Sequence, residues 1–238
     1  MQGSPDDALP LDEQAYRSLR RALVEGIFAP GDRLSIRRVA SALGTSAMPA
    51  RTALRRLASE QALDLLPSGT AIVPRLTRAA FAELSAVRAE LEPLAVRLAA
   101  PHMTPPLLSA LVALVANGHA ALAAGDAPAF LQADRHFLFT IYRAAAAPML
   151  LSIIEALWLR RGPLFWEARW VLLSRRGTAE RHQEILQALR EGLADQASAE
   201  LRDEIESAST FLLSQMPFAD AVSPQTRLDA LNPVAARP

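Results

Sequence analysis

From residue 78 onward, apolar residues recur at helical spacing almost to the end of the chain, and prolines and glycines divide this pattern into six segments. Ala and Leu are abundant, aromatic residues make up only 5% of the chain, and runs of β-branched residues are rare, so helices are favoured over strands. The breakers predict helices over 78–100, 104–124, 127–146, 148–173, 178–192 and 195–215, with Gly162-Pro163 as a candidate interruption of the fourth. This part of the chain is therefore expected to be entirely helical.

Residues 11–76 follow a different order, three helices and then a hairpin. The helices are expected over 11–26, 36–43 and 47–59, with Ser35 and Ser46 as candidate N-caps. Residues 63–66 and 71–73 are predicted to form two short strands around the turn at Pro67-Ser68-Gly69-Thr70. This order is typical of a winged helix-turn-helix, whose third helix enters the major groove of DNA.

The charges are distributed unevenly. The whole chain carries 25 basic and 25 acidic residues, and every basic residue is Arg. Residues 14–78 contain 11 Arg and four acidic residues, a net charge of +7, whereas residues 1–13 carry −4 and residues 79–238 carry −3. A basic segment gains affinity for nucleic acid by displacing counterions from phosphates. The zero sum therefore hides a candidate DNA-binding segment.

The absence of Lys and Cys excludes several kinds of chemistry. Without Lys there is neither a Schiff-base nucleophile nor a P-loop, and without Cys there is no disulfide, thiol nucleophile or Cys-ligated zinc. Residues 1–10 lack the basic start and apolar run of a signal peptide and are expected to be a disordered leader. We expect no stretch of about 18 uncharged apolar residues and therefore no membrane-spanning helix. We therefore expect a cytoplasmic protein with no membrane partner, ending in a disordered tail over 216–238.

Residues 11–78 resemble the DNA-binding domain of the GntR family of bacterial transcription regulators. The resemblance rests on the segments YRSLRRALVEG (16–26), PGDRL (30–34), RRVASALG (37–44), TSAMPAR (45–51), ALRRLASE (53–60) and SGT (68–70). It implies DNA contacts from Arg37, Ser46, Met48, Pro49, Arg51 and Gly69. Ala47 and Thr52 depart from the family, which commonly has Arg and Glu at these positions, so a different operator is expected.

The helical part resembles the FadR-like subgroup of that family, whose FCD-type effector domain is a bundle of six or seven helices. The matching segments are FAELSAVR (81–88), LEPLAVRLAA (91–100), ADRHF (133–137) and ERHQEI (180–185). The expected fold class is therefore mainly α, with a winged helix-turn-helix over 11–76 and a helical effector-binding and dimerisation domain over 77–215.

Most members of this subgroup hold a divalent metal with an Asp, a His four residues later and two further His. Here Asp134 and His182 match, but Leu138 and Glu204 stand at the other two positions. In one interpretation Asp134, His182 and Glu204 bind Zn, Ni, Mn or Fe. In the other, the metal is lost and an organic effector binds the more apolar pocket directly. Arg88 could then hold an effector carboxylate, or it could pair with Glu92 at i+4.

Two further groups of residues, one aromatic and one basic, each allow two interpretations. Four aromatic residues could line a ligand pocket or a dimer surface, with core packing as the favoured interpretation: Trp158, Phe165, Trp166 and Trp170. Arg160-Arg161 and Arg175-Arg176 were expected to be solvated helix ends rather than DNA contacts.

We therefore expect a ligand-responsive bacterial regulator that acts as a repressor. A homodimer would bind a palindromic operator in double-stranded DNA, and its helical domain would bind a small organic acid or acyl-type effector. The alternatives are a metal-dependent hydrolase built on Asp134, His182 and Glu204, and an architectural DNA-binding protein without an effector.

Overall fold

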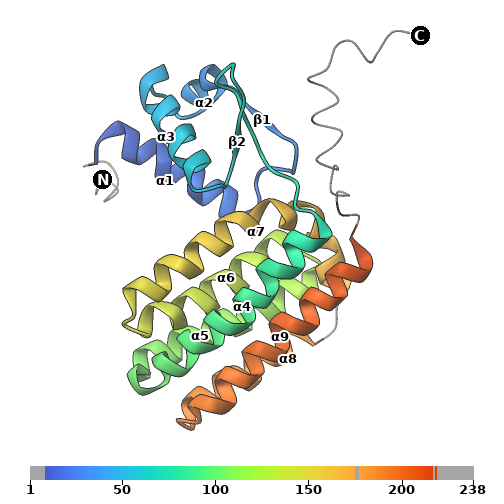
Figure 1. The fold of residues 1–238 in the computed structure, drawn as a ribbon. Helices are drawn as coiled ribbons and strands as arrows, with labels where there is room; N and C mark the ends of the chain where they lie inside the picture. Colours follow the sequence, from blue (N-terminus) through green and yellow to red (C-terminus); the bar gives the residue numbers. More distant parts are fainter. Residues whose placement is uncertain (1–8, 175–176, 217, 219–238) are drawn as a thin grey trace.

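The computed structural model describes residues 9–174, 177–216 and 218, and it confirms the mainly helical fold class. A small N-terminal head rests on a larger helical body (Figure 1). The predicted disordered leader and tail fall almost wholly outside the described residues, as do Arg175-Arg176.

The head contains three helices and a small antiparallel sheet. Its elements are α1 (Leu11–Val24), β1 (Arg33–Leu34), α2 (Ile36–Ala42), α3 (Ala47–Ser59), β2 (Asp64–Leu65) and β3 (Ala71–Ile72). The strand order is β1-β3-β2, with Leu34 opposite Ala71 on one side and Leu65 opposite it on the other. The strand β1 was not predicted, because two residues beside a Pro-Gly turn are too short to show a period of two.

The head has its own core between α1 and α3. Leu19 and Leu23 of α1 and Leu54 and Leu57 of α3 are all buried, each stabilising the fold by about 1.5–3 kcal/mol. One residue of the body, Leu159, belongs to the same apolar cluster. The head core therefore continues into the body.

The body contains the six predicted helices, with ends within two residues of the expected positions. They are α4 (Arg78–Ala99), α5 (Pro105–Ala124), α6 (Ala127–Ala144), α7 (Pro148–Ser174), α8 (Thr178–Arg190) and α9 (Ala194–Gln215), with the 3₁₀ turn η2 (Ala100–His102) after α4. Side chains of Thr77, Thr104 and Asp126 cap the starts of α4, α5 and α6, which explains why these helices begin there. The helix α7 continues through Gly162 and Pro163, both of which are buried.

The helix α5 corrects one expectation. It carries no Asp, Glu or Arg over 20 residues, and its mean hydropathy of 1.8 makes it long and apolar enough to cross a membrane by length and composition. Only 17% of its most apolar window is buried. In the fold it lies along the bundle, where Leu111 enters the core that also contains Phe137 and Ile185. The sequence therefore does hold an uncharged apolar stretch of this length, which the charge pattern had not predicted.

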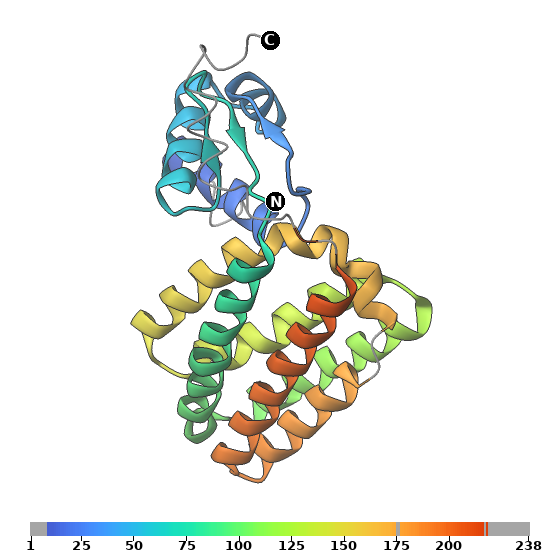
Figure 2. The ribbon, with the colours of Figure 1, turned by 45° about the vertical axis from the view of Figure 1, so that its right-hand side comes forward.

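The head meets the body where the end of α1 crosses α7 (Figure 2). The crossing is so close that a Cβ on Gly162 would lie 2.0 Å from the carbonyl oxygen of Leu23. Among the described residues, three ion pairs join the two parts: Arg20 to Glu155 at 3.2 Å, Arg135 to Glu25 at 3.1 Å and Arg75 to Glu167 at 3.0 Å. Backbone packing, an apolar side chain and charges therefore connect the head to the body, mainly to α7.

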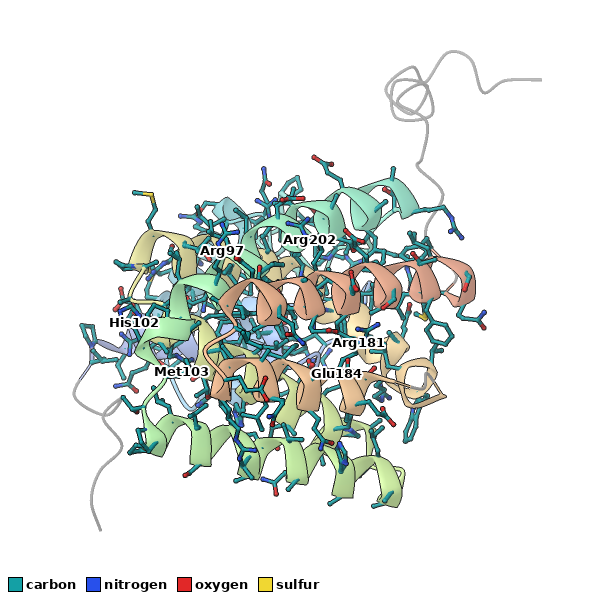
Figure 3. All side chains as sticks on the ribbon, turned by 90° about the horizontal axis from the view of Figure 1, so that it is seen from below. Arg97, His102, Met103, Arg181, Glu184 and Arg202 are labelled. Carbon is teal, nitrogen blue, oxygen red and sulfur yellow. The ribbon has the colours of Figure 1, made fainter. Side chains whose placement is uncertain are left out.

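The side of the bundle away from the head carries charged side chains, among them Arg97, Arg181 and Arg202 (Figure 3). Arg202 of α9 pairs with Glu90 of α4, and Arg181 of α8 pairs with Glu200 of α9. These pairs tie neighbouring helices at the surface, where each contributes about 0–1 kcal/mol.

Candidate functional site

The third helix of the head and the wing form one concave surface. Arg51 and Arg55, four residues apart on α3, share a helix face and are exposed. With residues 65–69 and Ile36 they line a depression of about 490 Å³. The surface is open to solvent and presents two guanidinium groups beside a tight turn.

The charges on this surface are not neutralised by the protein. In the described part of the chain no carboxylate lies within 4 Å of Arg37, Arg51 or Arg55. Other arginines of the head are paired: Arg56 with Glu13 at 2.8 Å, and Arg20 and Arg75 with acids of the body. Positive charge without an acidic partner is therefore available on α2 and α3, beside the wing.

The residues predicted to contact DNA lie on or beside this surface. Arg37 is exposed on α2, Ser46 and Met48 are exposed at the start of α3, and Pro49 is half-buried in its first turn. Ser46 occupies the N-cap position, but its side chain makes no capping hydrogen bond, unlike Ser35, which accepts from the backbone N–H of Arg38.

Gly69 shapes the wing. Its φ of +82° is a left-handed conformation that residues with a Cβ rarely adopt, and it allows the turn that Leu66 and Thr70 close with a 2.9 Å backbone hydrogen bond. Arg55 was not among the residues predicted to contact DNA. Its spacing of four from Arg51 on a predicted helix could have indicated that the two share one helix face.

Inside the body, a carboxylate gathers donors from three helices. Glu92 of α4 is fully buried and accepts from Arg88 Nε at 2.6 Å, Arg88 Nη2 at 3.1 Å, Tyr142 Oη at 2.7 Å and Trp158 Nε1 at 2.8 Å. Burial alone would lower the pKa of Arg88, but the Glu92 carboxylate raises it above its ordinary value. Burial and Glu92 together raise the pKa of Tyr142 well above its ordinary value. Of the two roles considered for Arg88, the ion pair with Glu92 is the one formed.

A second charged group lies beside the first. His182 Nε2 lies 3.2 Å from Asp134 Oδ1, and its ring stacks on Phe137 at 4.5 Å. Arg161 Nη2 lies 3.9 Å from Asp134 Oδ2. Burial would raise the pKa of Asp134, but His182 and Arg161 outweigh it and hold that pKa below its ordinary value.

Arg161 overturns the prediction of a solvated helix end. Its side chain is buried, with the guanidinium carbon 3.7 Å from the Trp158 ring centre and 3.9 Å from that of Phe165. Burial, together with the charge of Arg88, lowers the pKa of Arg161 to about 9, so it remains charged at neutral pH. Its carboxylate contact is beyond hydrogen-bonding distance, so the charge is incompletely compensated.

The aromatic cluster is divided between core and surface. Trp158 is buried, as core packing requires, whereas 59% of Trp170 is exposed, so the core interpretation is wrong for that residue. The side chain of Trp166 lies outside what the structure describes.

Most of the predicted effector residues line one small cavity. Arg88, Asp134, Leu138 and Glu204 all line a space of about 60 Å³, and His182 lies behind Asp134. A water molecule occupies about 30 Å³ of liquid, whereas pockets for small organic ligands usually measure about 300–1,000 Å³. Four of the five predicted effector residues therefore line one cavity, but its volume is well below the range of pockets that hold small organic ligands.

These residues do not fit a resident divalent metal. Asp134 and His182 are in contact, but Leu138 offers no ligand, and within residues 9–174 and 177–216 no three His, Asp or Glu side chains converge as metal ligands. Asp134 is moreover shared between His182 and Arg161. The interpretation in which Asp134, His182 and Glu204 bind an ion is therefore not supported by their geometry.

Two family models match the chain. The model of the bacterial regulatory proteins of the gntR family matches residues 11–73, and the FCD domain model matches residues 83–207. Together they cover the head and most of the body.

The chain is also similar to characterised and solved proteins. It is 36% identical over 150 residues to the HTH-type transcriptional regulator McbR of Escherichia coli K12. The aligned region covers 63% of this chain and 68% of McbR. The solved structure of E. coli McbR/YncC superposes with a TM-score of 0.79 at 32% identity, covering 87% of this chain and 98% of that one. A GntR regulator from Rhodococcus sp. RHA1 shares the fold, with a TM-score of 0.66 at 23% identity over 87% of this chain and 99% of that one.

These matches settle the class of the protein. The matched head and the McbR relative are transcription regulators, which are not enzymes, so the hydrolase alternative is excluded. The chain belongs to the GntR family of transcription regulators and carries an FCD domain.

Proposed function

We propose that this regulator works in the cytoplasm as a homodimeric repressor that binds a palindromic operator and is controlled by a small organic acid or acyl-type effector. The observation that carries the DNA-binding part is the set of uncompensated arginines on α2 and α3, Arg37, Arg51 and Arg55. Phosphates attract such a surface without sequence preference, and base edges then select the operator.

Each residue of the surface has a distinct role in the proposal. Arg51 reads a guanine in the major groove through two hydrogen bonds, and the exposed Met48 makes apolar contact with groove atoms such as a thymine methyl. Arg37 holds phosphate, and Ser46 with Pro49 positions the start of α3 against the backbone. The wing at Gly69 contacts DNA through its backbone, since it has no bulky side chain.

The working domain boundaries are 11–76 for the DNA-binding head and 77–215 for the effector and dimerisation domain. Two heads of a dimer would reach major grooves about 34–36 Å apart on one side of the duplex, which requires a palindromic site. Effector binding in the body would favour one arrangement of the heads over another.

The effector binds in the body near Arg88, Asp134, Leu138, His182 and Glu204, directly rather than through a metal. The support is chemical: buried guanidinium and imidazole groups suit a carboxylate, and Leu138 makes the site less polar than one built around an ion. The Arg88 charge is already satisfied by Glu92, so any contribution from Arg88 must be shared with that pair.

The experiment is DNA binding measured by fluorescence anisotropy. The probe is the labelled promoter region of the protein's own gene, and the control is a shuffled duplex of equal length. The proposal expects tighter binding to the promoter than to the control, and affinity for both that falls with salt. No binding to either duplex at low salt overturns it. The architectural alternative is favoured if DNA is bound but a library of organic acids leaves both the melting temperature and DNA affinity unchanged.

A further inference from the structure

A groove runs between the head and the body, beside the small cavity. Its volume is about 730 Å³. One wall is the end of α1 with the following Gly26 and Ile27, and the other is formed by the start of α6 and the second half of α7. Its size lies within the range of pockets that hold small organic ligands, and junctions between domains are preferred places for such pockets.

The groove and the cavity share a wall. Leu131, Arg161 and Phe165 line both spaces, so the guanidinium of Arg161 stands between them. This buried cation has one carboxylate contact, to Asp134, at 3.9 Å. An anion that reached Arg161 from the groove could therefore take up hydrogen bonds that Asp134 leaves unmade.

Besides charged and polar residues such as Arg135, Arg169 and Gln132, the groove has an aromatic and apolar part. Trp158 and Phe165 flank Arg161, and two side chains that proteins usually bury project into solvent: Trp170 is 59% exposed and Ile27 is 53% exposed. Aromatic faces favour a planar partner stacked with an offset or edge to face. Exposed apolar side chains around a pocket are typical of a ligand site.

The acidic groups in the groove are already engaged. Glu25 pairs with Arg135 at 3.1 Å, and Asp126 caps α6 by accepting from the backbone N–H of Ala129 at 3.0 Å. Neither acid is directed at Arg161 by any contact that the structure describes. The position next to Arg161 therefore keeps its preference for a negative charge.

We propose that this groove binds an aromatic organic anion, whose acidic group pairs with Arg161 and whose ring packs against Phe165 and Trp170. This rests on the proposed effector control and adds a second binding place, separate from the cavity lined by Arg88, Asp134 and Glu204. The ligand also touches Ile27 of the head, so it bridges head and body, and its binding changes how the head is held. The neighbouring cavity does not have to widen for this ligand, because the ligand stays in the groove.

The test uses the full chain and two probes, 8-anilinonaphthalene-1-sulfonate followed by fluorescence and 2-naphthoate followed by calorimetry. Trp170→Ala removes an exposed groove side chain and should weaken both about 5- to 10-fold. Arg161→Gln should weaken both by about tenfold or more. Because Arg161 is buried and its variant could fail to fold, Gln132→Trp, at an exposed groove position, provides a second route by filling the groove and should also weaken binding.

Two control variants separate the groove from other places. Met149→Ala removes an apolar side chain that is 80% exposed and does not line the groove, and it should leave the affinity for both probes unchanged. Ala208→Val narrows only the small cavity and should also have no effect. The groove site would be overturned if Ala208→Val weakened probe binding while Trp170→Ala left it unchanged. Equal probe affinity in all variants would also overturn it.

DNA binding without probe is measured on the same variants. If the unmodified protein does not bind DNA, the proposed function is overturned, but the result on probe binding in the groove still holds. Intact DNA binding without any probe binding would overturn the groove proposal alone.

Discussion

At the residue scale, burial and pairing give different roles to chemically identical arginines. All 25 cations are guanidinium groups, so their environments alone distinguish them. Arg51 is exposed without an acid nearby in the described structure, Arg88 is locked to Glu92, and Arg161 is buried between two aromatic rings. The first suits DNA, the second stabilises the fold, and the third suits an organic anion.

The first prediction concerns the head. Arg51→Ala should weaken binding to a verified operator by about 1–3 kcal/mol and relax its sequence preference, because one bidentate base contact is lost. The measurement is anisotropy at constant salt, with Arg97→Ala as the control because Arg97 is exposed at the far end of the body (Figure 3). Equal operator affinity in Arg51→Ala and the unmodified protein would contradict the role assigned to Arg51.

The second prediction compares the two tyrosines of the chain, each of which donates to a glutamate. Tyr142→Phe should lower the free energy of unfolding by about 1.5–3 kcal/mol, because the fully buried Glu92 carboxylate loses a donor that water cannot replace. Tyr16→Phe should cost less, since its partner Glu60 has a third of its side chain in solvent. Urea denaturation measures both, and an equal or larger loss in Tyr16→Phe would be inconsistent with this account.

The third prediction is a pH dependence with a defined sign. The pKa of Asp134 is lower in the folded chain than its ordinary value of 3.8, so the ionised carboxylate stabilises the fold above that pH. The stabilisation is lost as the pH falls through the folded pKa. Unfolding free energies at a series of pH values below 5 should therefore fall less steeply for Asp134→Asn than for the unmodified chain. Glu206→Gln, a substitution of an exposed acid, serves as the control.

At the element scale, α7 is the helix on which the head and the charged group both depend. Its residues Trp158 and Arg161 face the buried charges, while Leu159 and Gly162 face the head. The exposed residues of α7 include Met149, Ile153 and Trp170, so no polar stripe in the sequence marks the solvent face of this helix.

This explains why the sequence predicted the ends of α7 but not the orientation of its side chains. Breakers and capping residues mark helix boundaries, so all six body helices were found, whereas Arg161 was assigned to solvent because no apolar period fixed the helix rotation. The strand β1 had too few residues to be recognised. The family resemblance located the residues around the cavity, but whether they converge on an ion depends on distances between helices, which a sequence does not contain.

The fourth prediction compares two helical glycines. In Gly162→Ala the new methyl group would lie 2.0 Å from the Leu23 carbonyl oxygen, so α1 must move away from α7, at a cost of about 1–3 kcal/mol. In Gly118→Ala the methyl meets only an ordinary contact of 3.9 Å with Ala133, and the gain in helix propensity should stabilise the chain by about 0.5–1 kcal/mol. Thermal denaturation and limited proteolysis of the head check both. Destabilisation of equal size at the two positions would be inconsistent with a special contact at Gly162.

At the scale of the whole molecule, opposite charges are separated along the chain. The segment 14–78 carries +7 and the remaining segments carry −7 in total. The head itself, residues 11–76, holds ten Arg and six acidic residues, so a chain of zero net charge still presents one domain with a net charge of +4. Electrostatic attraction to DNA therefore acts on the head and is opposed by the body, which favours binding in one orientation.

The fifth prediction follows from this separation. If the two heads of a dimer contact about 6–10 phosphates, affinity for DNA should fall about 10³- to 10⁵-fold between 50 and 200 mM salt. A salt titration of anisotropy measures the slope, and a shuffled duplex should give a similar slope, because the phosphate contacts do not depend on sequence. A slope near zero would be incompatible with binding through the basic head.

Arg161 and Gly162 are adjacent residues, one in contact with the ligand groove and the other in contact with the head. Coupling between two binding events is reciprocal, so whatever factor the ligand imposes on operator affinity, the operator must impose on ligand affinity. Copies of the protein seated on an operator would then respond at a different ligand concentration from copies free in the cell. The threshold at which the gene switches would belong to the complex with DNA, and it could differ from one operator to another.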